Sequence, residues 1–125
     1  MQRVWMALGA LAGCGAVAMS AYAAHGLAGT DPAARHVVES GVQMQGWHAL
    51  ALLGTGLWAQ RGGWLADLAG AAFSVGLLLF CGAVYSLGIR GVSLGGIAPT
   101  GGMLLMLGWL LLALSAVFPR PLNMR

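Results

Sequence analysis

The sequence predicts an all-α, polytopic membrane protein, folded as a four-helix transmembrane bundle, and two observations support this prediction. Of its 125 residues, 59% are hydrophobic and only 7% are charged, whereas a soluble domain carries about 25% charged residues. The apolar residues also gather in segments, most of them close to the roughly 20 residues that a helix needs to cross about 30 Å of hydrocarbon. Residues 1–125 are therefore expected to form a single membrane domain.

Composition and charge exclude several other classes of protein. Disorder requires low hydrophobicity together with high net charge, and the two cysteines both lie in apolar runs, which does not suit a disulfide-stapled secreted module. The formal net charge of +3 comes from scattered arginines, without the clustered basic face that phosphate binding requires. The expected partner is thus the lipid bilayer, and no nucleic acid is expected to bind.

The first helix is expected near residues 3–25, because residues 4–24 contain no charge. Two short patterns within it resemble export signals: the lipoprotein-like box at 11–14 and the signal-peptidase-like site at 21–23. We expect this segment to be retained, because the residues that follow it do not form a soluble domain that would need export.

The second helix is expected near residues 32–60. Asp31 followed by Pro32 is a helix start signal, since an aspartate caps the first turn and proline suits the first helical position. The apolar core of this helix is too short to span alone, so the helix is expected to begin before the membrane. A separate surface helix with a kink near Gly41 or Gly46 is the alternative.

The third and fourth helices are expected near residues 65–88 and 100–118. Residues 68–87 contain no charge, and Pro99 and Pro119 lie on either side of the last apolar run. Proline is common just inside the start and just after the end of a helix.

The arginines predict the orientation of a four-span chain. The side that holds both termini would carry four arginines, and the opposite side two. The four are Arg3, Arg61, Arg120 and Arg125, and the two are Arg35 and Arg90. Because positive residues are enriched on the cytoplasmic side, we expect a multi-pass protein of the bacterial inner (plasma) membrane with both termini in the cytoplasm.

Small residues are unusually frequent, with 21 glycines in 125 residues against a typical share of about 7%. Gly9 and Gly13 are four apart in the first helix, and Gly82 and Ser86 are four apart in the third. Small residues at this spacing let helix backbones approach closely in lipid. These four positions are therefore expected to pack helices against one another.

Histidines are the first residues to consider for chemistry. Paired histidines on neighbouring helices can ligate haem, copper or zinc, and His25 and His48 are the weak metal candidates in this chain. We favour a structural role, in which His25 caps a helix end and His48 bonds across the bundle to His25, Gln45, Tyr85 or a backbone carbonyl. No metal, no cofactor and no catalytic residue is expected.

Five residues are expected to gather at the outer mouth of the bundle, where the first and third connections lie. They are His25, His48, Tyr85, Pro99 and Thr100. The glycine-rich connection over 88–102 is expected to pack as a turn on this mouth, with an anion or lipid-headgroup site beside Arg90 as the alternative.

Four sequence elements resemble the motifs of one family of small membrane proteins. They are SAYAAHGL at 20–27, QMQGWHAL at 43–50, FCGAVYSL at 80–87, and IAPTGG at 97–102 followed by Gly108-Trp109. The chain resembles the YgdD/YwdK-like proteins, domain of unknown function 423, over nearly its whole length. It departs from the family pattern at Tyr22 for Phe, at Cys81-Gly82-Ala83 for Ser-Gly-Ser, and at Ala98 for Thr. The resemblance implies a four-span inner-membrane protein and implies no reaction.

The expected function is that of a non-enzymatic accessory or assembly subunit in a larger membrane complex, whose partners are other membrane subunits or a further copy of the chain. The sequence contains no paired carboxylates, no Ser-His-Asp set and no dinucleotide glycine motif, so the usual acid–base and nucleophilic mechanisms lack their residues. Two alternatives stay open. One is metal or haem binding through histidine, and the other is a small transporter or channel formed by an oligomer.

Overall fold

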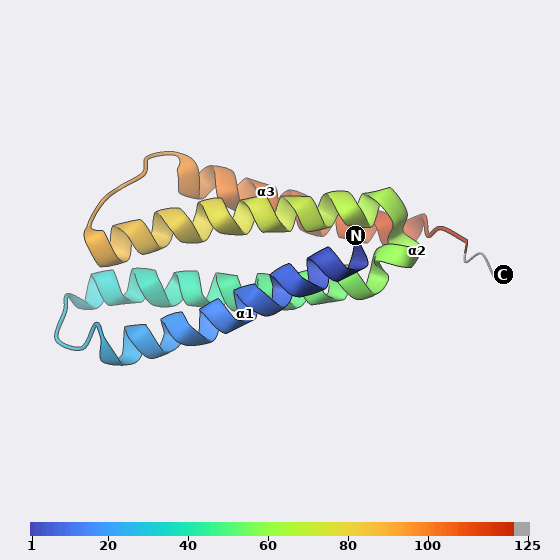
Figure 1. Ribbon diagram of the computed structural model, residues 1–125. Coiled ribbons are helices and arrows are strands. Elements are labelled where there is room, and N and C mark those ends of the chain that lie inside the picture. The colour runs from blue at the N-terminus through green and yellow to red at the C-terminus, as the bar shows by residue number, and fades with distance from the viewer. Residues whose placement is uncertain (122–125) are drawn as a thin grey trace.

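The computed structural model describes residues 1–121, which form three helices (Figure 1). These are α1 (Gln2–His25), α2 (Pro32–Arg90) and α3 (Ile97–Val117). By length and composition, each of the three can cross a membrane. The all-helical class expected from the sequence is therefore confirmed, with helices that are long and apolar enough to span a membrane.

Helix α2 reverses its direction at Gly63, where the backbone leaves helical geometry with φ 58° and ψ −143°. We call residues 32–62 the first arm and residues 64–90 the second arm. The two arms run back along each other (Figure 1), and the Cys81 thiol of the second arm donates to the Gly41 carbonyl of the first, with an S···O distance of 3.6 Å. Glycine adopts such a conformation without the steric cost that a Cβ would bring.

The prediction of four separate helices is wrong in number, because the segments expected near 32–60 and 65–88 form the single element α2 in the described chain. Helical hydrogen bonding continues on both sides of Gly63, so no loop separates the two arms. The kink considered near Gly41 or Gly46 does not occur either, since Gly63 is the non-helical position within α2.

The helix ends follow local chemistry. The Asp31 side chain accepts a hydrogen bond from the Ala33 N–H at 3.2 Å, and Pro32 occupies the first position of α2, as the start signal predicted. Gly91 ends α2 in the left-handed conformation, with φ 66°. Helix α3 begins at Ile97 and so includes Pro99 in its first turn, where a missing N–H costs nothing.

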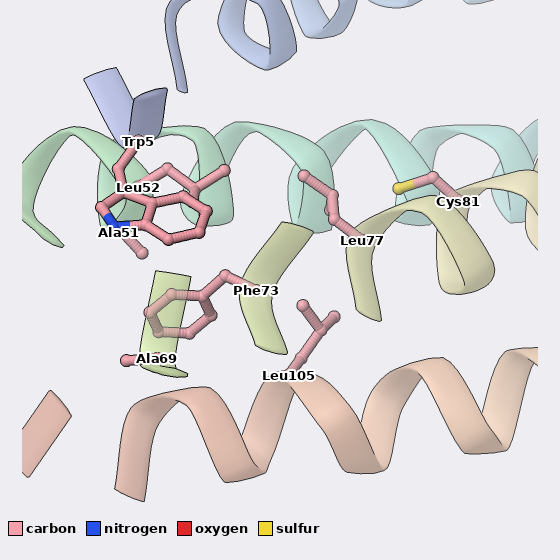
Figure 2. Packing of buried hydrophobic residues seen from close by; sticks show 8 residues of the cluster. All are labelled: Trp5, Ala51, Leu52, Ala69, Phe73, Leu77, Cys81 and Leu105. Carbon is pink, nitrogen blue, oxygen red and sulfur yellow. The ribbon is translucent and has the colours of Figure 1, made fainter. Parts of the chain in front are cut away.

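The core is a small cluster to which all three helices contribute (Figure 2). Trp5 comes from α1, Leu105 from α3, and the remaining members from the two arms of α2. The members are Trp5, Ala51, Leu52, Ala69, Phe73, Leu77, Cys81 and Leu105. Many large apolar side chains lie outside this core, for example Leu78 at 76% exposed, which suits a protein whose surroundings are lipid.

The four predicted packing positions differ in their surroundings. A Cβ added at Gly9 would lie 2.8 Å from the Ala49 carbonyl oxygen, so α1 and the first arm approach closely there. At Gly13 the nearest atom would be the Ala49 Cβ at an ordinary 3.8 Å. A Cβ added at Gly82 would have no atom within 4 Å, so this position faces open space. The backbone carbonyl of Ser86 accepts one of the hydrogen bonds that cap the end of α2. Close packing is thus found at Gly9 and not at Gly82.

Candidate functional site

His48 lies at the centre of the bundle with only 3% of its surface exposed. The indole N–H of Trp109 donates to His48 Nε2 at 3.1 Å, and His48 Nδ1 lies 2.6 Å from the Met44 carbonyl oxygen. Because an indole nitrogen only donates, Nε2 accepts, and the proton of the neutral imidazole is assigned to Nδ1, which donates to Met44. Both ring nitrogens are therefore engaged.

Aromatic rings surround His48 and join three parts of the fold. Its ring centroid lies 5.8 Å from that of Phe73 and 5.9 Å from that of Trp109, and the Phe73 and Trp109 rings meet edge-on at 5.2 Å. Gly108 lets the second arm come close to α3, since a Cβ there would lie 2.6 Å from the Phe73 ring. His48 on the first arm thus connects to the second arm through Phe73 and to α3 through Trp109.

Gln45, one turn before His48, makes the second polar connection. Its Nε2 donates to the Ala12 carbonyl of α1 at 3.0 Å, and its Oε1 accepts the Tyr85 hydroxyl of the second arm at 2.6 Å. Both ends of one amide therefore link the first arm to its two neighbours, as expected for a polar side chain within a membrane helix.

Two further tryptophans make polar connections toward the end of the bundle at which the chain begins. The Trp5 indole donates to Asp67 Oδ1 at 2.9 Å, and the Trp58 indole donates to Ser115 Oγ at 3.0 Å. Within residues 1–121, every buried side-chain nitrogen and oxygen has a hydrogen-bond partner. Bonds between helices therefore account for much of the polar chemistry of the interior.

The structure does not bring His25 and His48 together. His25 is the last residue of α1 and is exposed, whereas His48 precedes Ala49, which faces Gly13. From Gly13 to His25 the helix rises about 18 Å at 1.5 Å per residue. In the part of the chain that the structure describes, no group of three or more His, Cys, Asp or Glu side chains could hold a metal ion.

Of the five residues predicted at the outer mouth, His48 lies deeper in the bundle, whereas Tyr85 packs beside Ala23 and Leu27 at the end of α1. Tyr85 bonds to Gln45, and Pro99 and Thr100 are exposed in the first turn of α3, where Thr100 Oγ1 donates to the Gly96 carbonyl at 2.8 Å. His48 is not at the mouth because the first arm starts at Pro32, about 24 Å before it along the helix axis. The glycine-rich connection is also shorter than expected, since only residues 91–96 lie between α2 and α3, and all six are exposed.

Sequence reasoning missed the partners of the interior polar groups, namely Trp109, Trp58 and Trp5. The available signal was weak but physical. An indole N–H within an apolar helix requires an acceptor, and His48, Ser115 and Asp67 are among the few acceptor side chains in these segments. Pairing each donor with its acceptor requires the relative depths of the helices, which one sequence alone does not provide.

His48→Gln is expected to change the thermal unfolding temperature of the purified protein very little. Hydrogen bonds between membrane helices average about 0.6 kcal/mol, and the glutamine side chain still offers an acceptor to Trp109. Thermal unfolding in detergent, with elemental analysis of both proteins, measures this. Stoichiometric metal in the wild type that the variant loses, at unchanged stability, would contradict the structural role.

Comparison with known proteins places the chain in a family. Residues 19–102 match the family model described as "Protein of unknown function (DUF423)". The chain is 35% identical to a UPF0382 membrane protein of Haemophilus influenzae, over 90% of this chain and 93% of that protein. It is 34% identical to the UPF0382 membrane protein YwdK of Bacillus subtilis, over 92% and 97% of the two chains. No solved structure matches it. The chain therefore belongs to the DUF423 family of membrane proteins of unknown function, the family that its sequence motifs resemble.

Proposed function

We propose that this chain is a non-enzymatic accessory or assembly subunit that docks sideways, within the inner membrane, against another membrane protein. The observation that carries this proposal is an apolar hollow of about 550 Å³ between the first arm and α3, which we call the lateral hollow. Its lining residues are Trp47, Leu50, Ala51, Gly54, Trp109 and Leu112.

The exposed side chain of Trp47 is the reason to expect a protein partner at the lateral hollow. Its side chain is 61% exposed and lies near the middle of the bundle, beside His48, whereas membrane tryptophans are enriched at the two lipid–water interfaces. Trp5, Trp58 and Trp109 each donate their indole N–H to a protein acceptor. Among residues 1–121, Trp47 and Trp64 make no such bond, and Trp64 lies beside the turn at the end of the bundle. An unpaired N–H in hydrocarbon costs several kcal/mol, and a helix of another protein would provide the acceptor.

A fourfold crossing of the membrane is part of this proposal. At 1.5 Å per residue the first arm is about 46 Å long and the second about 40 Å, so each exceeds the roughly 30 Å of hydrocarbon. The reversal at Gly63 then returns the chain to the side from which the first arm came, and the N-terminus and the end of α3 lie on the side of the Gly63 turn.

The proposed orientation puts that side in the cytoplasm. Arg3, Arg61 and Arg120 belong to the end of the bundle that holds the Gly63 turn. The other end holds Arg35 and Arg90, and Arg35 pairs with Glu39 at 3.1 Å. Because arginine and lysine are enriched in cytoplasmic segments, the end with the three arginines is assigned to the cytoplasm.

The interior favours a structural role over metal binding or transport. Both nitrogens of His48 are already used, so a metal would have to displace Trp109 or Met44. The centre of the bundle is filled by Phe73, Leu52 and Leu105, each 2% exposed or less. The interactions available to a partner therefore lie on the outer, lipid-facing surface.

Extraction in polymer-bounded native nanodiscs, followed by mass measurement of the intact assembly, tests the accessory role. We expect the wild type to be recovered with a second membrane protein at a fixed ratio. Trp47→Ala is expected to lose that partner, and Trp64→Ala, which removes another exposed tryptophan at 65% exposure, is the matched control. Recovery of the wild type as an isolated monomer, or only as copies of itself, would contradict the proposal.

A further inference from the structure

A second hollow lies at the end of the bundle where α2 reverses, on a different part of the surface from the lateral hollow. Its volume is about 450 Å³, and we call it the turn hollow. It is lined by the Gly63 turn and by Trp64, Leu65, Leu114, Phe118 and Arg120. Four of these five side chains are apolar and one is a cation, which is the combination that an amphipathic ligand requires.

Arg120 is held at the rim of the turn hollow by its own backbone. Its N–H donates to the Arg61 carbonyl at 2.6 Å, which ties the chain after α3 to the turn. Its side chain lies over Gly63, because a Cβ added there would be 3.5 Å from Arg120 Nε. The Arg120 side chain thus lies within ordinary van der Waals range of the Gly63 position.

Among the described residues, this end of the bundle holds three arginines and a single acidic side chain, Asp67, so it keeps a net positive charge. Arg35–Glu39 is the ion pair found within residues 1–121, and it belongs to the opposite end. Asp67, the acidic residue nearest the turn, accepts the Trp5 indole. The Arg61 guanidinium lies 5.9 Å from the centre of the Trp58 ring. Arg61 and Arg120 therefore remain available to an anion.

The apolar lining of the turn hollow indicates which anion would bind. Trp64 and Phe118 are 65% and 67% exposed beside these arginines, and aromatic residues are enriched at the level of lipid headgroups. A small soluble anion would gain nothing from Trp64, Leu114 and Phe118, whereas the glycerol and upper acyl chains of a phospholipid would cover them.

We propose that the turn hollow binds an anionic phospholipid, with its phosphate at Arg120 and its acyl chains against Leu114 and Phe118. Arginine suits this role because its planar guanidinium donates two parallel hydrogen bonds to phosphate oxygens. The arginine favours a lipid with a net negative charge, and the apolar lining favours a lipid over a soluble anion. This site is independent of the accessory role and of the partner at the lateral hollow.

Native mass spectrometry of the full chain, released from nanodiscs of phosphatidylethanolamine and phosphatidylglycerol, tests the site. The wild type is expected to retain phosphatidylglycerol above its share of the bilayer. Arg120→Gln is expected to lower that enrichment about fivefold, which corresponds to about 1 kcal/mol for each basic residue near an anionic membrane. Arg35→Gln, at the opposite end, is the matched control and is expected to leave the enrichment unchanged.

A second variant keeps the proposal testable if Arg120→Gln fails to fold. Phe118→Ala leaves every charge in place and is expected to lower retention of phosphatidylglycerol because the acyl chains lose their contact. Equal enrichment in wild type and Arg120→Gln, or an equal loss in Arg35→Gln, would overturn the site. Displacement of the lipid by excess inorganic phosphate, or unchanged retention in Phe118→Ala, would also overturn it, since either result means that the guanidinium alone binds anions.

Discussion

Replacing Gly63 with alanine is expected to destabilise the protein by about 1–3 kcal/mol, the usual cost of a residue held in a sparsely populated backbone conformation. The φ of 58° and ψ of −143° at Gly63 lie outside the regions that L-residues with a Cβ adopt readily. The reversal of α2 depends on this one residue, so the variant must strain the turn or open the contact between the two arms. Unfolding followed by tryptophan fluorescence in mixed micelles measures the change.

Gly54→Ala is the matched control for this variant. Gly54 also lies in α2, but it is helical, and an added Cβ would meet nothing within 4 Å. Alanine is favoured over glycine in helices by up to about 1 kcal/mol, so this control is expected to be neutral or slightly stabilising. Equal stability of the Gly63→Ala and Gly54→Ala proteins would contradict the reversal at Gly63.

Gly101→Ala is expected to separate α3 from the second arm and to cost about 1–3 kcal/mol, as overpacking of a close contact does. A Cβ at this position would lie 2.5 Å from the Phe80 backbone nitrogen and 2.8 Å from the Gly76 carbonyl oxygen. Both obstacles are backbone atoms of a helix, so neither can rotate away as a flexible side chain would. The same unfolding measurement detects the loss.

The next residue provides a close control. A Cβ at Gly102 would meet only the Phe80 ring, at 3.9 Å, so Gly102→Ala is expected to keep wild-type stability. If Gly101→Ala and Gly102→Ala have the same free energy of unfolding, the close backbone contact between α3 and the second arm does not exist. Both positions are glycines in adjacent places of α3, so the comparison isolates the clash of an added Cβ with the backbone of the second arm.

The sequence predicted those features of the fold that depend on composition and on local chemistry. Charge-free runs located α1 and α3, and Asp31-Pro32 located the start of α2. The sequence expected the chain to turn back between residues 60 and 65, and it reverses there, at Gly63. It did not predict that helical hydrogen bonding continues through the turn, because this chain has 21 glycines and one with positive φ resembles a helical one in sequence. Among the described residues, four glycines have positive φ, and Gly63 is the one of these within a helix.

The sequence predicted that the polar side chains of the site would be hydrogen-bonded, but it did not predict which residues would be their partners. His48 was expected to be hydrogen-bonded in the bundle, and it is: its bond to the Met44 backbone carbonyl was among those expected, whereas its bond to Trp109 was not. The expected partners Gln45 and Tyr85 bond to each other instead. The depth of a side chain depends on where its helix begins and on how neighbouring helices slide past one another, and single-sequence patterns do not contain that register.

Site-specific photocrosslinking in native membranes tests the accessory role most directly. A photoreactive residue at Leu50, which is 68% exposed in the lateral hollow, is compared with one at Val17, which is 73% exposed on α1. Docking through the lateral hollow predicts one discrete protein adduct at position 50, lost in Trp47→Ala, and only lipid adducts at position 17. Lipid adducts alone at both positions would contradict the accessory role.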